Sequence, residues 1–397
     1  MFESLSLAPP DALFGLNEAF KADPNPEKIN LVVGVYKDEE GLTPILSSVK
    51  KAEAHILEKQ TTKGYLPISG SPVYAQAVQG LLLGDDHSLI TQKKIQTAHT
   101  PGGTGGLRVG ADFLKKICPE ASVWLSNPTW ANHKAIFQSA GYETKDYPYY
   151  DKENQCLGFD SFLKALSLIP SGDIVLLHVC CHNPTGVDPT REQWKQIADV
   201  AEVAGWFPFF DFAYQGFGES VEADRYPLEL FAEKELEFVI SASFSKNMGL
   251  YNERTGSFSV VAQTTEAAAS AFSYVKTAIR SNYSNPSSHG GAIVEEVLTD
   301  QDLRAEWTGE LDAMRERIKY LRATLVEGLK ARGIDRDFSF IQEQNGMFSF
   351  SGLNPEQVKT LKESHSIYVA GSGRINVAGI NQKNLDPLCD AIAAVMA

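Results

Sequence analysis

One lysine in this chain stands among small hydroxyl residues, with an arginine eight positions further on. The segment is SFSKNMGLYNER, which runs from Ser243 to Arg254 and contains Ser245 and Lys246. A lysine amine held near its neutral form can make a Schiff base with a carbonyl group, and a phosphate group needs hydroxyl donors and a planar cationic fork. The segment therefore predicts a site for an aldehyde cofactor that carries a phosphate, with Lys246 as the covalent attachment point. Taken alone, the same letters also fit an ordinary charged surface loop.

A second group of residues fits the ring of such a cofactor. In DFAYQGF, Asp211 follows a short apolar run and Tyr214 comes three residues later. Pyridoxal phosphate withdraws electrons only while its ring nitrogen is protonated, and this requires a carboxylate partner, which Asp211 can provide. Tyr214 and Asn183, the latter in CCHNPTG, can donate to the ring's phenolate oxygen. Singly, Asp211 could be a cap and Asn183 a turn residue, but beside Lys246 they favour a cofactor site.

Eight motifs follow one another along nearly the whole chain. They are INLVVGVYKDEEG, TPGGTGGLR, SNPTWANHKAIF, CCHNPTG, DFAYQGF, SFSKNMGLYNERTG, IRSNYSNPSSHG and GSGRINVAG. In this order they resemble the aspartate aminotransferases of the pyridoxal-phosphate fold-type I superfamily, above all the bacterial members and their aromatic relatives. The resemblance implies an α/β fold in which a mostly parallel seven-stranded sheet is sandwiched by helices, with a smaller α/β domain built from both termini.

The phosphate group is expected at the glycine-rich motif. Gly103 and Thr104 stand in TPGGTGGLR just before a helical run, where free backbone amides and the positive helix end can hold an anion. The motif alone is weak and lacks the GK[ST] ending of a nucleotide P-loop. Ser243, Ser245 and Arg254 would complete the phosphate site.

The resemblance also assigns residues around the cofactor ring. Trp130 in NPTWANH matches the aromatic residue that packs over the ring, and His133 matches the residue that supports the pyridine-binding Asp211. Tyr65 in YLPISG matches a tyrosine that reaches the phosphate in the partner subunit. For Trp130 and His133, packing in the core is the open alternative.

Two arginines are expected to bind the substrate. Arg374 in GSGRINVAG matches the residue for the α-carboxylate, which arginine's fork binds through both oxygens, although a turn arginine paired with a surface acid would look the same locally. Arg280 in AIRSNYSN matches the residue that reaches from the neighbouring subunit to a side-chain carboxylate; as an alternative, it is the cationic end of an apolar-faced helix. Gly34 in VVGVYKD matches a backbone contact near the substrate.

The resemblance implies ping-pong transamination in which Lys246, freed from the cofactor, moves the proton of the substrate α-carbon. We expect aspartate to donate its amino group to 2-oxoglutarate, giving oxaloacetate and glutamate, because Arg280 suits a dicarboxylate. YLPISG and the Thr129-Trp130 pair look more like the aromatic branch, so tyrosine and phenylalanine are alternative donors. Because Tyr65 and Arg280 match residues that act on the partner's site, we expect a homodimer with shared active sites.

Two other functions fit the cofactor motifs less well. A lyase or decarboxylase on the same fold would keep the cofactor residues but alter the substrate arginines, whereas Arg280 and Arg374 are both present. A non-enzymatic, ligand-sensing relative would need an attached DNA-binding module, and no basic helix-turn-helix pattern precedes residues 2–30.

Composition and charge narrow the class of protein. The chain has 397 residues, 43% of them hydrophobic, which suffices for a large core and two or more domains. The net charge of −14 disfavours nucleic acid as a partner, since phosphate backbones are bound by clustered Lys and Arg. Five cysteines without a CxxC spacing predict neither a disulfide framework nor a zinc ribbon, and no metal site is expected.

The protein is expected to be cytoplasmic and without a membrane partner. No stretch approaches the roughly twenty apolar residues of a membrane span. The first thirty residues carry several acidic side chains, unlike a signal peptide: Glu3, Asp11, Glu18 and Asp23.

Apolar runs and helix signals alternate along the chain, as in a parallel sheet covered by helices. The predicted strands are 123–125, 174–179, 207–210, 238–242 and 258–261. Thr190 with Gln193 predicts a capping box, and Asn354 before Pro355 predicts a capped helix start. A long periodic helix is expected over 302–332. By resemblance, residues 1–44 form an N-terminal arm and part of the small domain, 45–313 the large cofactor domain, and 314–397 the rest of the small domain.

Overall fold

The chain divides into two compact units. The structure is a computed structural model that describes residues 2–7 and 12–396. Unit 1 comprises Met1–Thr43, Ile318–Glu343 and Met347–Ala397, and unit 2 comprises Pro44–Arg317 and Gln344–Gly346. We keep the predicted large domain, residues 45–313, as a proposal. It is supported by unit 2, which covers nearly the same residues.

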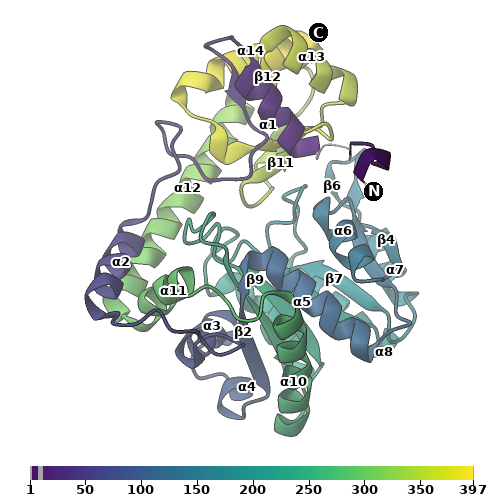
Figure 1. Cartoon of the computed structure of the whole chain (residues 1–397). Helices are drawn as coiled ribbons and strands as arrows, with labels where there is room; N and C mark the ends of the chain where they lie inside the picture. The colour runs from purple at the N-terminus through teal and green to yellow at the C-terminus, as the bar shows by residue number, and fades with distance from the viewer. Residues whose placement is uncertain (1, 8–11, 397) are drawn as a thin grey trace. The chain divides into compact units, whose positions relative to one another are not determined.

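Unit 2 is built on a seven-stranded sheet flanked by helices (Figure 1). In spatial order the strands are β2 (Ile95–Pro101), β10 (Thr255–Val261), β9 (Phe238–Ser243), β8 (Phe207–Phe212), β7 (Ile174–His178), β3 (Val123–Asn127) and β4 (Thr144–Pro148). Strand β10 runs antiparallel to β2 and β9, and the other pairs are parallel. The α/β class and the mostly parallel sheet are therefore confirmed. All five predicted strands are present, but β2 and β4 were not predicted.

Helix α5 (Gly102–Ile117) contacts strands β2, β10, β9 and β8, and α10 (Thr265–Asn282) packs beside it. Two glycines allow this close approach to the sheet. A Cβ atom at Gly110 would lie 2.5 Å from a ring carbon of Phe258, and one at Gly106 would lie 2.5 Å from Oγ of Ser241. Because real Cβ contacts are longer, only glycine lets α5 lie at this depth. The first turn of α5 is thereby held at the end of β9.

The other helices of unit 2 surround this core. They are α2 (Ser47–Lys59), α3 (Pro72–Leu83), α4 (Ser88–Thr91), α6 (Asn132–Ser139), α7 (Phe159–Ser167), α8 (Arg191–Ala204), α9 (Tyr226–Glu233) and α11 (His289–Thr299), with the 3-10 turn η2 (Ala223–Arg225). Strands β5 (Tyr150–Asp151) and β6 (Cys156–Leu157) pair antiparallel in a separate two-stranded sheet. The predicted capping box of Thr190 and Gln193 is confirmed at the start of α8.

Unit 1 contains both ends of the chain and two small sheets. Strand β1 (Ile29–Asn30) pairs in parallel with β12 (Ile367–Tyr368), and β11 (Phe348–Phe350) pairs antiparallel with β13 (Arg374–Asn376). The remaining elements are η1 (Phe2–Ser4), α1 (Ala12–Ala22), η3 (Ser339–Ile341), α13 (Pro355–His365), η4 (Val377–Gly379) and α14 (Gln382–Met396). Asn354 caps α13 as predicted, with Pro355 in its first turn. Helix α12 (Gln301–Ala331) is the predicted long helix and continues from unit 2 into unit 1.

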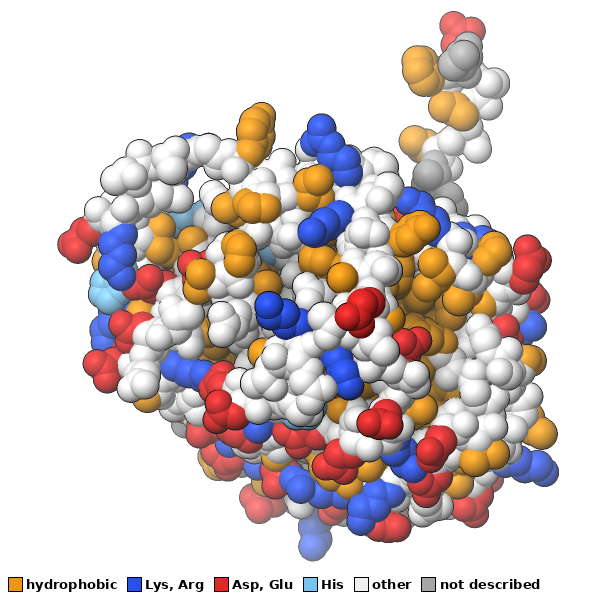
Figure 2. Space-filling model, turned by 90° about the horizontal axis from the view of Figure 1, so that it is seen from below, with side chains coloured by type: hydrophobic (Ala, Val, Ile, Leu, Met, Phe, Trp, Pro, Cys, Tyr) orange, Lys and Arg blue, Asp and Glu red, His pale blue; other side chains and the backbone are white. Residues whose placement is uncertain are grey.

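Charged side chains of both signs are interspersed on the face shown in Figure 2. The electrostatic potential over this face is therefore neither uniformly positive nor uniformly negative. Within the described part of the chain, no helix combines the length and apolarity needed to cross a bilayer.

Candidate active site

The predicted cofactor residues of unit 2 gather at one edge of the sheet. Asp211 lies near the end of β8, and it is paired in register with His178 at the end of β7 and with Ser241 in β9. Lys246 follows β9, and Asn183 follows β7. Since the carboxyl ends of parallel strands meet at one edge, side chains of separate motifs come together there, the usual place for ligands in such sheets.

Asp211 and His133 form a buried pair. Nε2 of His133 donates to Oδ2 of Asp211 over 3.0 Å, and His133 Nδ1 lies 2.7 Å from the hydroxyl of Thr129. His133 is wholly buried and Asp211 is 7% exposed. Burial raises the pKa of Asp211, but the hydrogen bond and charge of His133, with further charges including that of Lys246, hold it below its usual value. Asp211 is therefore a stable buried anion, as a partner for a protonated ring nitrogen must be.

The amine of Lys246 lies close to Tyr214. Its Nζ atom is 5.1 Å from the centroid of the Tyr214 ring. Burial lowers the pKa of Lys246 to about 8; the charge of Asp211 opposes this effect, and that of Arg254 adds to it. The side chain keeps partial exposure. A substantial neutral fraction near pH 8 makes this amine a competent nucleophile and base.

The start of α5, the serines after β9 and Arg254 converge. A Cβ at Gly102 would lie 2.5 Å from Nη2 of Arg254, and one at Gly103 would lie 3.1 Å from Cβ of Ser243. Nη1 of Arg254 donates to the carbonyl of Tyr251 over 3.0 Å and to Oγ of Ser245 over 3.5 Å.

Gly103 and Thr104 lie within the first turn of α5 rather than before it, so the position predicted for them was wrong by a few residues. Their amides can still bind an anion, because the first amides of a helix have no hydrogen-bond partner within it. Together with the guanidinium and the two serine hydroxyls, they form a cradle suited to a dianionic phosphate.

Three further predicted residues border this cluster. The rings of Trp130 and His133 meet edge to face, with centroids 5.2 Å apart, and Trp130 is partly exposed. Tyr214 is 5% exposed and Asn183 is 7% exposed. Asn183 stands in the loop after β7, and Tyr214 stands in the loop after the neighbouring strand β8, which carries Asp211.

Sequence reasoning missed His178. Its ring centroid is 5.2 Å from that of His133 and 4.4 Å from that of His182, and both of its ring nitrogens are buried without a hydrogen-bond partner. Burial, helped by the charge of His133, lowers the pKa of His178 to about 3, so this ring is neutral at working pH. The available signal was a histidine within the apolar run 174–179.

Tyr65 and Arg280 do not join this cluster within one chain. Tyr65 is 95% exposed, and Arg280, in the last turn of α10, is exposed and donates to the hydroxyl of Ser284. Both residues line the same surface groove, together with Tyr283. Residues 215 positions apart in the sequence thus meet on one open surface.

Arg374 and Gly34 belong to unit 1. Arg374 is 6% exposed, its Nη2 donates to the carbonyl of Val32 over 2.8 Å, and its guanidinium lies 4.2 Å from the ring centroid of Phe348. A Cβ at Gly34 would lie 2.6 Å from the same ring, so any larger residue there would have to displace the ring of Phe348. The structure thus excludes the alternative of Arg374 as an exposed turn residue.

The residues of the unit 2 cluster fit pyridoxal phosphate. The cluster offers a lysine with a lowered pKa, a buried carboxylate fixed by a histidine, a tyrosine beside the amine, and an anion cradle in which an added Cβ would clash. These groups match the aldehyde, the ring nitrogen, the phenolate oxygen and the phosphate of that cofactor.

Comparisons with known proteins give one family. A family model described as aminotransferase class I and II matches residues 26–392. The chain is 52% identical over 396 residues to the aspartate aminotransferase of Escherichia coli (strain K12), and 42% identical over 397 residues to the aromatic-amino-acid aminotransferase of the same organism; each match covers 100% of both chains. The crystal structure of an aromatic-amino-acid aminotransferase from Burkholderia pseudomallei, covalently bound to pyridoxal phosphate, matches with a TM-score of 0.98 at 50% identity, covering 100% of both chains.

Proposed function

The chain belongs to the class I and II aminotransferases, and from this premise we propose that it moves the amino group of L-aspartate to 2-oxoglutarate. The products are oxaloacetate and L-glutamate, and the cofactor is pyridoxal 5'-phosphate. The observation that carries the proposal is the low pKa of the Lys246 amine close to Tyr214 and to the buried Asp211–His133 pair.

Each residue of the cluster has a role in the proposed reaction. Bound pyridoxal phosphate supplies a carbonyl that links to amines and a ring that accepts electrons. Lys246 holds the cofactor and then takes the proton from the α-carbon of the substrate. Asp211, fixed by His133, supplies the negative charge at the ring nitrogen. Tyr214 and Asn183 donate to the phenolate oxygen, and Trp130 packs over the ring. The phosphate is held by Gly103, Thr104, Ser243, Ser245 and Arg254.

Two arginines and a glycine select the substrate. Arg374 binds the α-carboxylate through two parallel hydrogen bonds, and its packing against Phe348 and Val32 restricts the guanidinium to few orientations. The backbone at Gly34 contacts the substrate nearby. Arg280 binds the second carboxylate of aspartate or 2-oxoglutarate.

A dual specificity is the second candidate. The chain is 42–50% identical to bacterial proteins named aromatic-amino-acid aminotransferases, which supports tyrosine and phenylalanine as further donors. A guanidinium at position 280 that turns toward water does not stay unpaired opposite an aromatic ring, so one site can accept both kinds of donor.

The active unit is a homodimer with shared sites, in the cytoplasm. The support for the dimer is that Tyr65 and Arg280, both matched to residues that act on a partner's site, line one exposed groove of unit 2. An exposed tyrosine beside an arginine is also typical of interface composition.

Steady-state turnover of purified protein tests this function. With 2-oxoglutarate as acceptor, we expect kcat/KM for aspartate to exceed that for tyrosine and phenylalanine, because only aspartate satisfies Arg280. Oxaloacetate can be followed by coupling to malate dehydrogenase, and the aromatic oxo acids by their own absorbance. A higher kcat/KM for the aromatic donors would make the second candidate the main function.

A further inference from the structure

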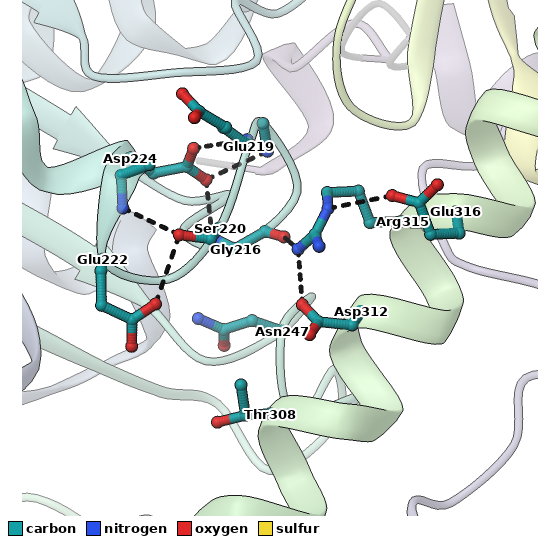
Figure 3. Close-up of polar contacts among 12 residues, drawn as sticks. Gly216, Glu219, Ser220, Glu222, Asp224, Asn247, Thr308, Asp312, Arg315 and Glu316 are labelled. Atoms are coloured by element: carbon teal, nitrogen blue, oxygen red, sulfur yellow. Dashed lines mark hydrogen bonds and ion pairs between the residues drawn. The ribbon is translucent and has the colours of Figure 1, made fainter.

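The loop that carries Tyr214 closes around one buried carboxylate. Asp224, in the 3-10 turn η2, is 6% exposed and follows this loop in the chain. Its Oδ2 accepts hydrogen bonds from the backbone amides of Gly216 over 2.8 Å and of Gly218 over 3.0 Å, and its Oδ1 accepts from the amide of Glu219 over 2.7 Å (Figure 3). Three backbone amides within four residues of the loop are thus tied to one side chain.

Among the residues that the structure describes, no ion pair with a cation involves this carboxylate. Its negative charge is therefore stabilised by the dipoles of backbone amides. Burial raises the pKa of Asp224, and the amides of Glu219, Gly218 and Gly216 oppose that rise. The thiol of Cys180, just past β7, lies 3.6 Å from Oδ2 of Asp224 and 3.5 Å from the carbonyl oxygen of Tyr214, so it can donate to either. The Cys180 thiol thus lies between the Asp224 carboxylate and the backbone of Tyr214, just past the end of β7.

The opposite side of the loop is tied to α12 and to the residue after Lys246. Nη1 of Arg315 donates to the carbonyl of Gly216 over 3.0 Å and pairs with Asp312 over 2.7 Å (Figure 3). The side-chain amide of Asn247 donates through Nδ2 to the backbone carbonyl of Gln215 over 3.3 Å. The indole of Trp307 donates to the carbonyl of Asn247 over 2.7 Å. One set of hydrogen bonds thus spans the loops of Tyr214 and Lys246.

Two glycines leave this loop little freedom to move. Gly216 has φ +92°, and a Cβ there would lie 2.3 Å from Cδ2 of Leu311. A Cβ at Gly218 would lie 2.6 Å from Oδ1 of Asp224. The backbone therefore approaches both α12 and the carboxylate as closely as it can.

We propose that Asp224 is a positioning residue that fixes the phenol of Tyr214 relative to the amine of Lys246. The inference rests on the proposed function only in taking Tyr214 as the donor to the cofactor's phenolate oxygen. Asparagine at position 224 would keep the size of the side chain but offer one acceptor oxygen in place of two, so at least one loop amide would lose its partner. Tyr214 would then leave its place beside Lys246.

The test compares the wild-type holoenzyme with Asp224→Asn in two measurements that need no substrate. Hydrogen exchange of a peptide covering 212–222 should become about tenfold faster at its protected amides, because charge-assisted bonds are lost. The visible absorbance of the bound cofactor should titrate about one pH unit higher, because a displaced Tyr214 no longer stabilises the phenolate. Neither readout depends on which amino acid is the donor, so failure of the proposed aspartate specificity would leave this test intact.

Two further variants separate positioning from general stability. Asp173 is also a buried carboxylate, accepting from the amide of Ser122 and the indole of Trp124, but it precedes β7 at the opposite edge of the sheet. Asp173→Asn should lower the melting temperature without moving the absorbance titration. Gly218→Ala should push the Asp224 carboxylate aside and move the titration in the same direction as Asp224→Asn. The proposal would be overturned if the cofactor absorbance of Asp224→Asn or Gly218→Ala titrated at the same pH as in the wild type. It would also be overturned if Asp173→Asn shifted this titration as much as Asp224→Asn does.

Discussion

Replacing Lys246 by alanine should lower kcat for aspartate about 10⁴-fold or more. The change removes both the covalent anchor of the cofactor and the base at the α-carbon, and a general base alone typically contributes 10²- to 10⁴-fold. The phosphate cradle of Arg254 and the start of α5 remains, so the variant should still bind cofactor, though without a covalent bond. Single-turnover rates on cofactor-loaded protein measure the loss separately from binding.

The control for this prediction is Lys59→Ala. Lys59 is an exposed lysine whose amine pairs with Glu296 over 2.7 Å, outside the cluster at the sheet edge. Its loss should leave kcat unchanged. If Lys246→Ala kept turnover within tenfold of the wild-type value, another group would have to be the base, and the proposed role of Lys246 would be wrong.

Substituting Arg280 by leucine should lower kcat/KM for aspartate about 10³-fold while sparing phenylalanine and tyrosine. Breaking a desolvated charge pair by removing one partner costs about 3–5 kcal/mol, and each 1.36 kcal/mol is a factor of ten. An aromatic substrate makes no such charge pair, so its kcat/KM should fall little. Arg374→Leu should instead damage all donors, since every amino acid presents an α-carboxylate. The informative quantity is the ratio of the two kcat/KM values in each variant.

Subunit exchange distinguishes a shared site from one complete within a chain. If Arg280 acts on the partner's site, a heterodimer of Lys246→Ala and Arg280→Leu subunits contains one site with both lesions and one with neither. Mixing the two inactive proteins should then restore up to about a quarter of the wild-type aspartate activity, because half of the dimers are mixed and each has one intact site. No regain after verified exchange, or equal losses for aspartate and phenylalanine in Arg280→Leu, would contradict the role of Arg280.

The apolar strands of the sheet could be predicted because they are buried on both faces and are therefore almost uniformly hydrophobic. Strand β2 escaped prediction because it is buried yet polar: Thr97, His99 and Thr100 are each at most 3% exposed. Strand β4 escaped for the opposite reason, since it lies at the sheet edge and exposes polar side chains. In both cases hydrophobic periodicity carries no strand signal.

The members of the candidate site could be named from motifs, but their pairings could not. His133 and Asp211 are 78 positions apart, and only the strand order brings α6 to the end of β8. Asp224 looks like an ordinary acid in VEADR, because its importance arises from three backbone amides that have no sequence signature. The pKa of Lys246 likewise depends on burial that no local spacing reveals.

The half-reaction with aspartate alone is the most direct test of the central claim, that the cluster around Lys246 transfers an amino group. Purified protein with bound pyridoxal phosphate is mixed with aspartate in the absence of any oxo acid, and absorbance and released products are followed together. We predict one equivalent of oxaloacetate per site, retention of the amino group on the protein, and recovery of the first spectrum with release of glutamate when 2-oxoglutarate is added. Continuous turnover without an oxo acid, with release of ammonia or carbon dioxide, would mean lyase or decarboxylase chemistry and would contradict the account.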